Sequence, residues 1–177
     1  DGKTVNIANN NILKEALKVY VELMNSGTVT LTPDWNAGVS AINNGEVASS
    51  PTGAWYAGTI MGSEEQSGKW AISEIPRLGA VKDSINASSI GGGGWYVLKG
   101  VGNSETAKDF LKETFASDAD LMNTLAKEIG LVSTLNAAAE TENYQSPSEF
   151  FSNEKIFQNF STWSGEVPVV NYGLHTY

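Results

Sequence analysis

Helical and strand-like hydrophobic patterns alternate along this chain, and the alternation limits the folds open to it. Apolar side chains at helical spacing follow Asn10 and Asn11, either of which can cap a helix, and Gly27 suits the helix end. Three short runs have the composition or alternation of strands: residues 47–49, 69–75 and 95–98. Strands mixed with covering helices predict an α/β fold.

Further helix starts are marked by side chains that can accept hydrogen bonds from free backbone donors. Asp34 predicts one helix, and Ser104 and Ser117 predict two more, the last of which ends at Gly130. The clearest start combines a capping box with proline at the first helical position, in the motif Ser146-Pro147-Ser148-Glu149. We expect these helices to cover a sheet.

Size and charge exclude several functional classes. The 177 residues, 41% of them hydrophobic, are enough for one sizeable core, and the absence of Cys rules out disulfides and thiolate metal sites. A net charge of -9 repels phosphate backbones, so nucleic acid is not an expected partner. No apolar run approaches the roughly 18 residues of a membrane span. We interpret both ends, Asp1 and Tyr177, as cuts in a longer protein.

Catalytic chemistry has little support in the sequence. The lone histidine, His175, has no second histidine or cysteine to complete a metal site, and we expect neither metal nor cofactor. No Gly-x-Ser-x-Gly motif is present, and the glycine run at residues 91–94 lacks the Lys-Ser/Thr of a phosphate-binding loop. Carboxylates abound without an evident acid/base pair, so a glycosidase stays only as an alternative.

Aromatic residues are the remaining chemical signal. The chain has five Trp and six Tyr, and planar rings suit the apolar C–H face of a pyranose. A tight turn at residues 51–56 delivers Trp55 and Tyr56 at the start of a short helix. The glycine run at 91–94 then enters a predicted strand with almost no side chains, which suggests a need for bare backbone.

An ordered set of motifs resembles the family 1 extracellular solute-binding proteins, the maltose-binding-protein-like receptors. The motifs are Asn44-Gly45-Glu46-Val47-Ala48, Gly53-Ala54-Trp55, Ile75-Pro76, Gly92-Gly93-Gly94-Trp95 and the segment from Asn103 to Leu111. Each motif alone is weak, but all five occur in the order and spacing of the family. The flanking helices extend the resemblance over nearly the whole chain.

The resemblance implies a partial type II periplasmic-binding-protein-like fold, in which two α/β lobes close around a ligand. Residues 1–88 would form the α/β part of lobe two. Residues 89–140 would supply a hinge strand and helices that pack on lobe one. Residues 141–177 would return to lobe two, which is truncated here.

The resemblance also implies ligand-binding residues. Trp55 matches the family tryptophan that commonly stacks on sugar, and Gly92, Gly93 and Gly94 match the open backbone of the hinge strand. Further candidates are Trp95, Trp35, Tyr172 and Tyr177. For Trp35, the spacing with Val39 and Ile42 favours a core stripe, and Trp95 is as compatible with burial as with exposure to the cleft.

The implied function is that of a carbohydrate-binding receptor subunit of an ABC importer, not an enzyme. It would bind a mono- or oligosaccharide in the cleft between the lobes and deliver it to a membrane permease. The full-length protein is expected to be a monomer, located outside the cell as a bacterial surface lipoprotein or in the periplasm. The alternatives are a secreted carbohydrate-active enzyme and a receptor for a non-sugar solute.

Overall fold

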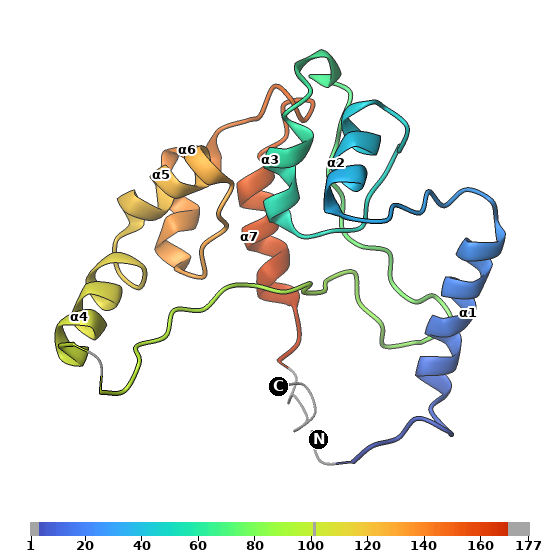
Figure 1. Ribbon diagram of the computed structural model, residues 1–177, viewed down its shortest axis with the longest axis horizontal. Helices are drawn as coiled ribbons and strands as arrows, with labels where there is room; N and C mark the ends of the chain where they lie inside the picture. The colour runs from blue at the N-terminus through green and yellow to red at the C-terminus, as the bar shows by residue number, and fades with distance from the viewer. Residues whose placement is uncertain (1–3, 101, 170–177) are drawn as a thin grey trace.

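The computed structural model describes residues 4–100 and 102–169, and the regular elements in this part of the chain are helical (Figure 1). The α-helices are α1 (Asn11–Asn25), α2 (Trp35–Asn43), α3 (Ala57–Ile60), α4 (Ser104–Thr114), α5 (Ala119–Ile129), α6 (Glu142–Gln145) and α7 (Ile156–Glu166). Three 3-10 turns accompany them, η1 (Ala54–Tyr56), η2 (Glu64–Gln66) and η3 (Asn136–Glu140). Long irregular segments join these elements.

The first two helices begin where a side chain satisfies a free backbone N–H group. Asn10 accepts a hydrogen bond from the backbone of Leu13 at 3.0 Å, and Asp34 accepts one from Ala37 at 2.9 Å. Gly27, with a φ of 74°, follows the end of α1 in the left-handed conformation that glycine favours. The predicted positions of α1 and α2 are confirmed.

The starts predicted for α4 and α5 are each wrong by one residue. The capping residues are Asn103 and Asp118 rather than Ser104 and Ser117. Their side-chain oxygens accept hydrogen bonds from backbone N–H groups of the first helical turns, at 3.1 Å for Asn103 and 2.9 Å for Asp118. The Ser117 hydroxyl instead donates to carbonyl oxygens at the end of α4. Gly130 ends α5 with a φ of 68°, as predicted.

The capping box at residues 146–149 does not start a helix, and that prediction is wrong. Ser146 instead follows α6, and its hydroxyl donates to the carbonyl of the residue four before it at 2.8 Å. A tight turn spans residues 148–154, with positive φ values of 56° at Ser152 and 64° at Asn153. Helix α7 begins only after this turn.

Contacts with a distant segment hold this turn. The Glu154 carboxylate accepts a hydrogen bond from the backbone N–H of Ile72 at 3.2 Å, and the Ser152 hydroxyl donates to the carbonyl of Trp70 at 2.9 Å. Phe151 is buried, with 1% of its surface exposed. Since a helix through these residues would break both bonds, tertiary contacts override the local helix signal.

The strands expected at residues 47–49, 69–75 and 95–98 are absent from the described chain, which corrects the prediction. All three runs lie in irregular segments, and the one bridge in the described residues is an isolated antiparallel pair, Ser148 with Glu154. A strand is stable only when its backbone groups pair with a neighbouring strand. The sheet of the expected α/β fold is therefore not observed in this part of the chain.

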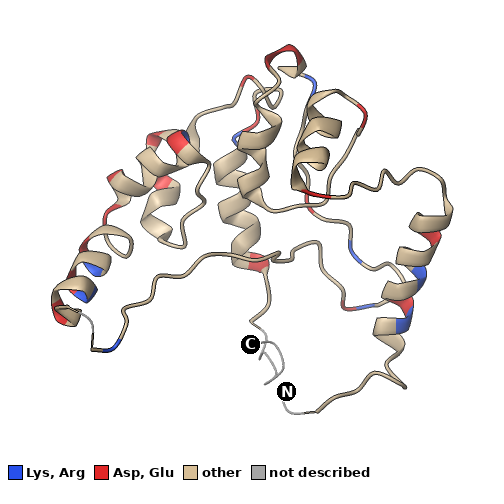
Figure 2. Cartoon of the chain, viewed as in Figure 1, with Lys and Arg blue, Asp and Glu red and all other residues tan. Residues whose placement is uncertain are grey.

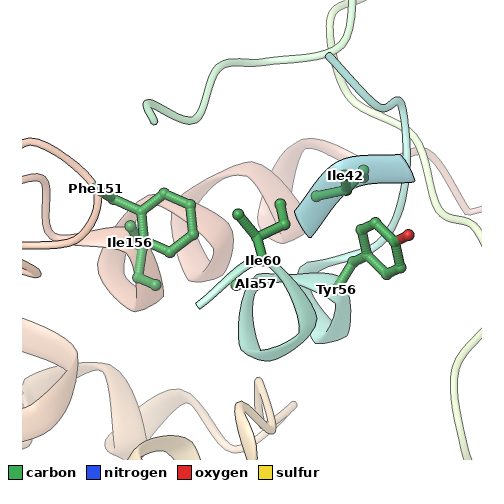
Figure 3. Close-up of a cluster of buried hydrophobic side chains, with 6 residues drawn as sticks. All are labelled: Ile42, Tyr56, Ala57, Ile60, Phe151 and Ile156. Carbon is green, nitrogen blue, oxygen red and sulfur yellow. The ribbon is translucent and has the colours of Figure 1, made fainter. Parts of the chain in front are cut away.

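Two hydrophobic cores hold α2, α3, α5, α6 and α7 together. The first core joins α2, η1, α3 and α7 and contains Ile42, Tyr56, Ala57, Ile60, Phe151 and Ile156 (Figure 3). The second core lies among α5, η3 and α6 and contains Met122, Ala126, Ala138 and Tyr144. Phe157 of α7 packs against both cores, so α7 links them.

Helices α1 and α4 lie at opposite edges of the chain and bury no residue (Figure 1). On α1, Leu17, Tyr20 and Val21 keep 54%, 60% and 51% of their surface exposed. No helix in the described ranges is long and apolar enough to cross a membrane. The expected division at residues 1–88, 89–140 and 141–177 stays a prediction.

Candidate functional site

Three aromatic rings meet where α2 and η1 come together, and we call Trp35, Trp55 and Tyr56 the aromatic corner. The ring centroids of the two indoles are 5.6 Å apart and their planes are tilted by 38°. Tyr56 meets Trp35 edge-on at 5.2 Å and Trp55 edge-on at 5.7 Å. Aromatic pairs at these separations attract one another, so each ring restrains the other two.

The corner has a buried base and an exposed surface. Tyr56 is 6% exposed and belongs to the first core, where it lies near Ile42 (Figure 3). Trp35 and Trp55 are 54% and 48% exposed. Trp35 is the first residue of α2, directly after the cap Asp34, so the fixed start of the helix sets where its side chain emerges. The core stripe favoured for Trp35 by its spacing is therefore wrong.

Two hydroxyl groups lie beside Gly38 in the first half of α2. A Cβ at Gly38 would lie 3.4 Å from the Thr32 hydroxyl and 4.0 Å from the Tyr56 hydroxyl, so both hydroxyls flank this glycine. Among the residues that the structure describes, these hydroxyls and the N–H groups of Trp35 and Trp55 form no hydrogen bond. The corner thus offers apolar ring faces beside unused donors and acceptors, the combination that a sugar requires.

The predicted hinge residues lie elsewhere. Gly92, Gly93 and Gly94 belong to an exposed irregular segment that runs below α7 toward α4, away from α2 and α3 (Figure 1). Gly92 has a φ of 147°, a conformation that requires glycine. Trp95 is 67% exposed and packs on Phe115, with ring centroids 4.8 Å apart. The structure therefore brings Trp35 and Trp55 together and leaves the hinge residues apart from them.

Two further candidates, Tyr172 and Tyr177, lie outside the described residues. Sequence reasoning missed Tyr56 and Thr32 as members of the site. The adjacent pair Trp55 and Tyr56 was a usable signal. Neighbouring residues in a tight turn point in different directions, so one ring can be buried as a support while the other is exposed. Nothing in the sequence pattern singles out Thr32.

Two shallow surface grooves lie apart from the corner. One follows the apolar side of α1 and the loop before it, and the other is lined by residues that include Asn43, Gln66 and Lys69. The second groove also contains Glu65, whose pKa is lowered chiefly by a hydrogen bond from the Ser63 hydroxyl at 2.6 Å. A catalytic general acid needs a raised pKa, so this carboxylate is unsuited to that role.

Charged groups are spread over the surface. Figure 2 shows Lys and Arg scattered over several elements, with no single basic face among the drawn residues. In residues 4–100 and 102–169, no three His, Cys, Asp or Glu side chains are grouped so that they could hold a metal ion. In the described residues, the aromatic corner brings together two predicted site residues from different elements, Trp35 of α2 and Trp55 of η1.

Known proteins are similar to most of this chain. The profile of the bacterial extracellular solute-binding proteins matches residues 1–152, which include the whole aromatic corner. A lactose-binding protein from Rhizobium radiobacter is 39% identical over 173 residues, or 98% of this chain. The chain spans 41% of the length of that relative. No solved structure matches the chain.

The profile match covers well over half of the chain and agrees with the resemblance found in the motifs. The match is to a family of solute-binding proteins, and it confirms the prediction that the chain is not an enzyme. The chain belongs to the family of bacterial extracellular solute-binding proteins.

Proposed function

We propose that this chain is part of a carbohydrate-binding receptor subunit of an ABC importer, and that Trp35 and Trp55 stack on the bound sugar. One observation carries the proposal, namely the pair of half-exposed indoles that rest on buried Tyr56. Family membership and the name of the lactose-binding relative support a sugar as the ligand.

The corner supplies both kinds of contact that a pyranose makes. The indole faces cover the apolar C–H face of the ring, and burial of that face contributes about 25 cal/mol per Å². The indole N–H groups and the hydroxyls of Thr32 and Tyr56 then serve the hydroxyls at the ring edge. We propose a mono- or oligosaccharide as the ligand of this corner.

In the complete receptor, we place the corner at a cleft between two lobes of a type II fold. We propose that Gly92, Gly93 and Gly94 form the hinge crossing. Trp95, Tyr172 and Tyr177 are further candidate contacts. The lobe assignments are those expected for residues 1–88, 89–140 and 141–177.

The same proposal includes the cellular setting. Family membership supports an extracellular or periplasmic location. We propose that the receptor is a monomer, held at the cell surface as a lipoprotein or free in the periplasm, and that it delivers sugar to a membrane permease. Closure of the lobes around the ligand is the signal that the permease reads.

Calorimetric titration of the full-length protein tests the proposal. Lactose is the first ligand, followed by a panel of monosaccharides and other oligosaccharides, with analysis of the sugars afterwards. We expect binding of an unchanged sugar and at least about a tenfold weaker affinity in Trp55→Ala, because a lost stacking contact is worth about 1.4 kcal/mol. Trp163→Ala is the control, since Trp163 lies on α7 beside Phe160, apart from the corner.

Each outcome has a distinct meaning. Equal losses in Trp55→Ala and Trp163→Ala would contradict the assignment of the corner. Cleavage of the sugar would contradict a receptor, and an absence of binding across the panel would favour the non-sugar solute.

A further inference from the structure

We infer that Gly53 is a positioning residue for the sugar-stacking surface, because it leaves the space that the Trp55 indole occupies. This inference rests on the proposed function for its effect on affinity. A Cβ built on Gly53 would overlap Nε1 of Trp55 and would lie 2.9 Å from Cδ1 and 3.1 Å from Cε2 of the same indole. Contacts below 3.0 Å essentially never occur for a real Cβ, so any larger residue at 53 must displace the indole.

The requirement at this position is for space and not for an unusual backbone. Gly53 has a φ of -80° and a ψ of 163°, extended values that any residue adopts. The glycine is therefore not explained by turn geometry. The three nearest atoms to the added Cβ all belong to the indole of Trp55, so a substitution acts first on this side chain.

The displaced indole can move into solvent, so a substitution at residue 53 can change the position of Trp55 without unfolding the surrounding structure. Trp55 is 48% exposed, so it can rotate into solvent while Tyr56 beneath it stays in the first core. Rotation would break the contact with Trp35 at 5.6 Å and change the 38° tilt between the two indoles. The stacking surface would be lost although the surrounding helices stay intact.

Gly58 offers a matched control a few residues away. It lies in α3, is exposed, and has no atom within 4 Å of an added Cβ. Alanine there is sterically free and favours the helix. Gly53→Ala and Gly58→Ala therefore make the same chemical change in neighbouring elements, and only the first meets Trp55.

Two measurements on the full-length protein test the inference. Fluorine NMR of fluorotryptophan-labelled protein, with the Trp55 resonance assigned by its loss in Trp55→Phe, reports the indole position without any ligand. Calorimetry with lactose reports affinity. We expect Gly53→Ala to move the Trp55 resonance and to weaken lactose binding by about tenfold or more, the value of one lost stacking contact. Gly58→Ala should change neither.

An unmoved Trp55 resonance in Gly53→Ala would overturn the inference, because the indole would then not lie against residue 53. A moved resonance with unchanged lactose affinity would overturn the positioning role in binding. If the wild-type protein binds no sugar, the proposed function fails, while the resonance still decides whether Gly53 sets the position of Trp55.

Discussion

Gln66 joins the end of α2 to the segment that follows η2, and its removal should weaken the element that carries Trp35. Its side-chain nitrogen donates to the carbonyl oxygens of Ile42 at 3.0 Å and Asn43 at 2.8 Å. Its side-chain oxygen accepts a hydrogen bond from the Trp70 indole at 2.6 Å. The last carbonyls of a helix have no partner within the helix, so Gln66 caps α2 from a distant part of the chain.

The expected loss follows from these three bonds. Gln66 is 9% exposed, and a net hydrogen bond in such a place contributes about 1 kcal/mol. Gln66→Leu keeps similar bulk and removes all three bonds. The Ile42 carbonyl retains a second bond, from the backbone of Gly45 at 3.0 Å, and the Asn43 carbonyl retains one from the Ser63 hydroxyl at 2.9 Å, which lowers the expected cost. We therefore expect a loss of about 2 to 3 kcal/mol in the free energy of unfolding.

Urea unfolding of the full-length protein measures this loss. Gln158→Leu is the control, because the Gln158 side chain on α7 forms no hydrogen bond with a described residue, and it should change stability by less than about 0.5 kcal/mol. Gln66→Glu keeps the acceptor for Trp70 but sets a carboxylate oxygen against the carbonyl oxygens of Ile42 and Asn43, so it should cost at least as much as Gln66→Leu. A Gln66→Leu loss no greater than that of Gln158→Leu would refute the reasoning.

Two further stability predictions concern the second core and α5. Tyr144→Phe should cost about 1 to 2 kcal/mol at neutral pH, because the fully buried phenol oxygen accepts a hydrogen bond from the Ser133 backbone at 2.8 Å. Burial raises the pKa of Tyr144 above 10.0, so folding favours the protonated phenol. The wild-type advantage over Tyr144→Phe is then full below about pH 10 and is lost as pH rises through the raised pKa, and unfolding measured across that range checks the sign. Asp118→Ala should cost about 1 kcal/mol by loss of the cap bond to Leu121, and Ser117→Ala should cost less. The reverse order in urea unfolding would contradict the observed cap.

Helix positions were predictable because helix starts and ends are decided locally. Asn10 and Asp34 accept hydrogen bonds from a backbone N–H three residues ahead, and Gly130 ends α5 in a conformation that glycine favours. The errors at Ser104 and Ser117 arose because each serine is adjacent to an Asn or Asp that is equally able to cap a helix, and that residue is the cap. Local chemistry then predicts the helix but not the exact capping residue.

Strands and the turn before α7 were not predictable in the same way. Residues 69–75 alternate as a strand does, but alternation says which side chains share a face and not which backbone pairs with them. The turn at 148–154 has the sequence of a helix start, and its conformation is decided by bonds to Ile72 and Trp70, far away in the chain. Such long-range contacts cannot be recognised from the local spacing of residue types.

The sequence predicted the members of the site better than their arrangement. The family motif singles out Trp55, and Trp35 is a further candidate whose spacing with Ile42 favours a core stripe. The structure buries Ile42 at 3% exposure and leaves Trp35 half exposed, because Trp35 stands at the first position of α2. Whether two tryptophans share a surface depends on how η1 packs against α2, which no single motif encodes.

The aromatic corner is held from several directions, and this bears on how tightly it can bind. Asp34 fixes the start of α2, Gln66 fixes its end, and Tyr56 anchors both indoles to the first core. Gly53 leaves the Trp55 indole its place. Immobilising a free side chain on binding costs about 0.5 to 1.5 kcal/mol, so two indoles that are already restrained spare the complex much of that loss. The contacts that stabilise the fold are thus the ones that keep the stacking surface ready for a ligand.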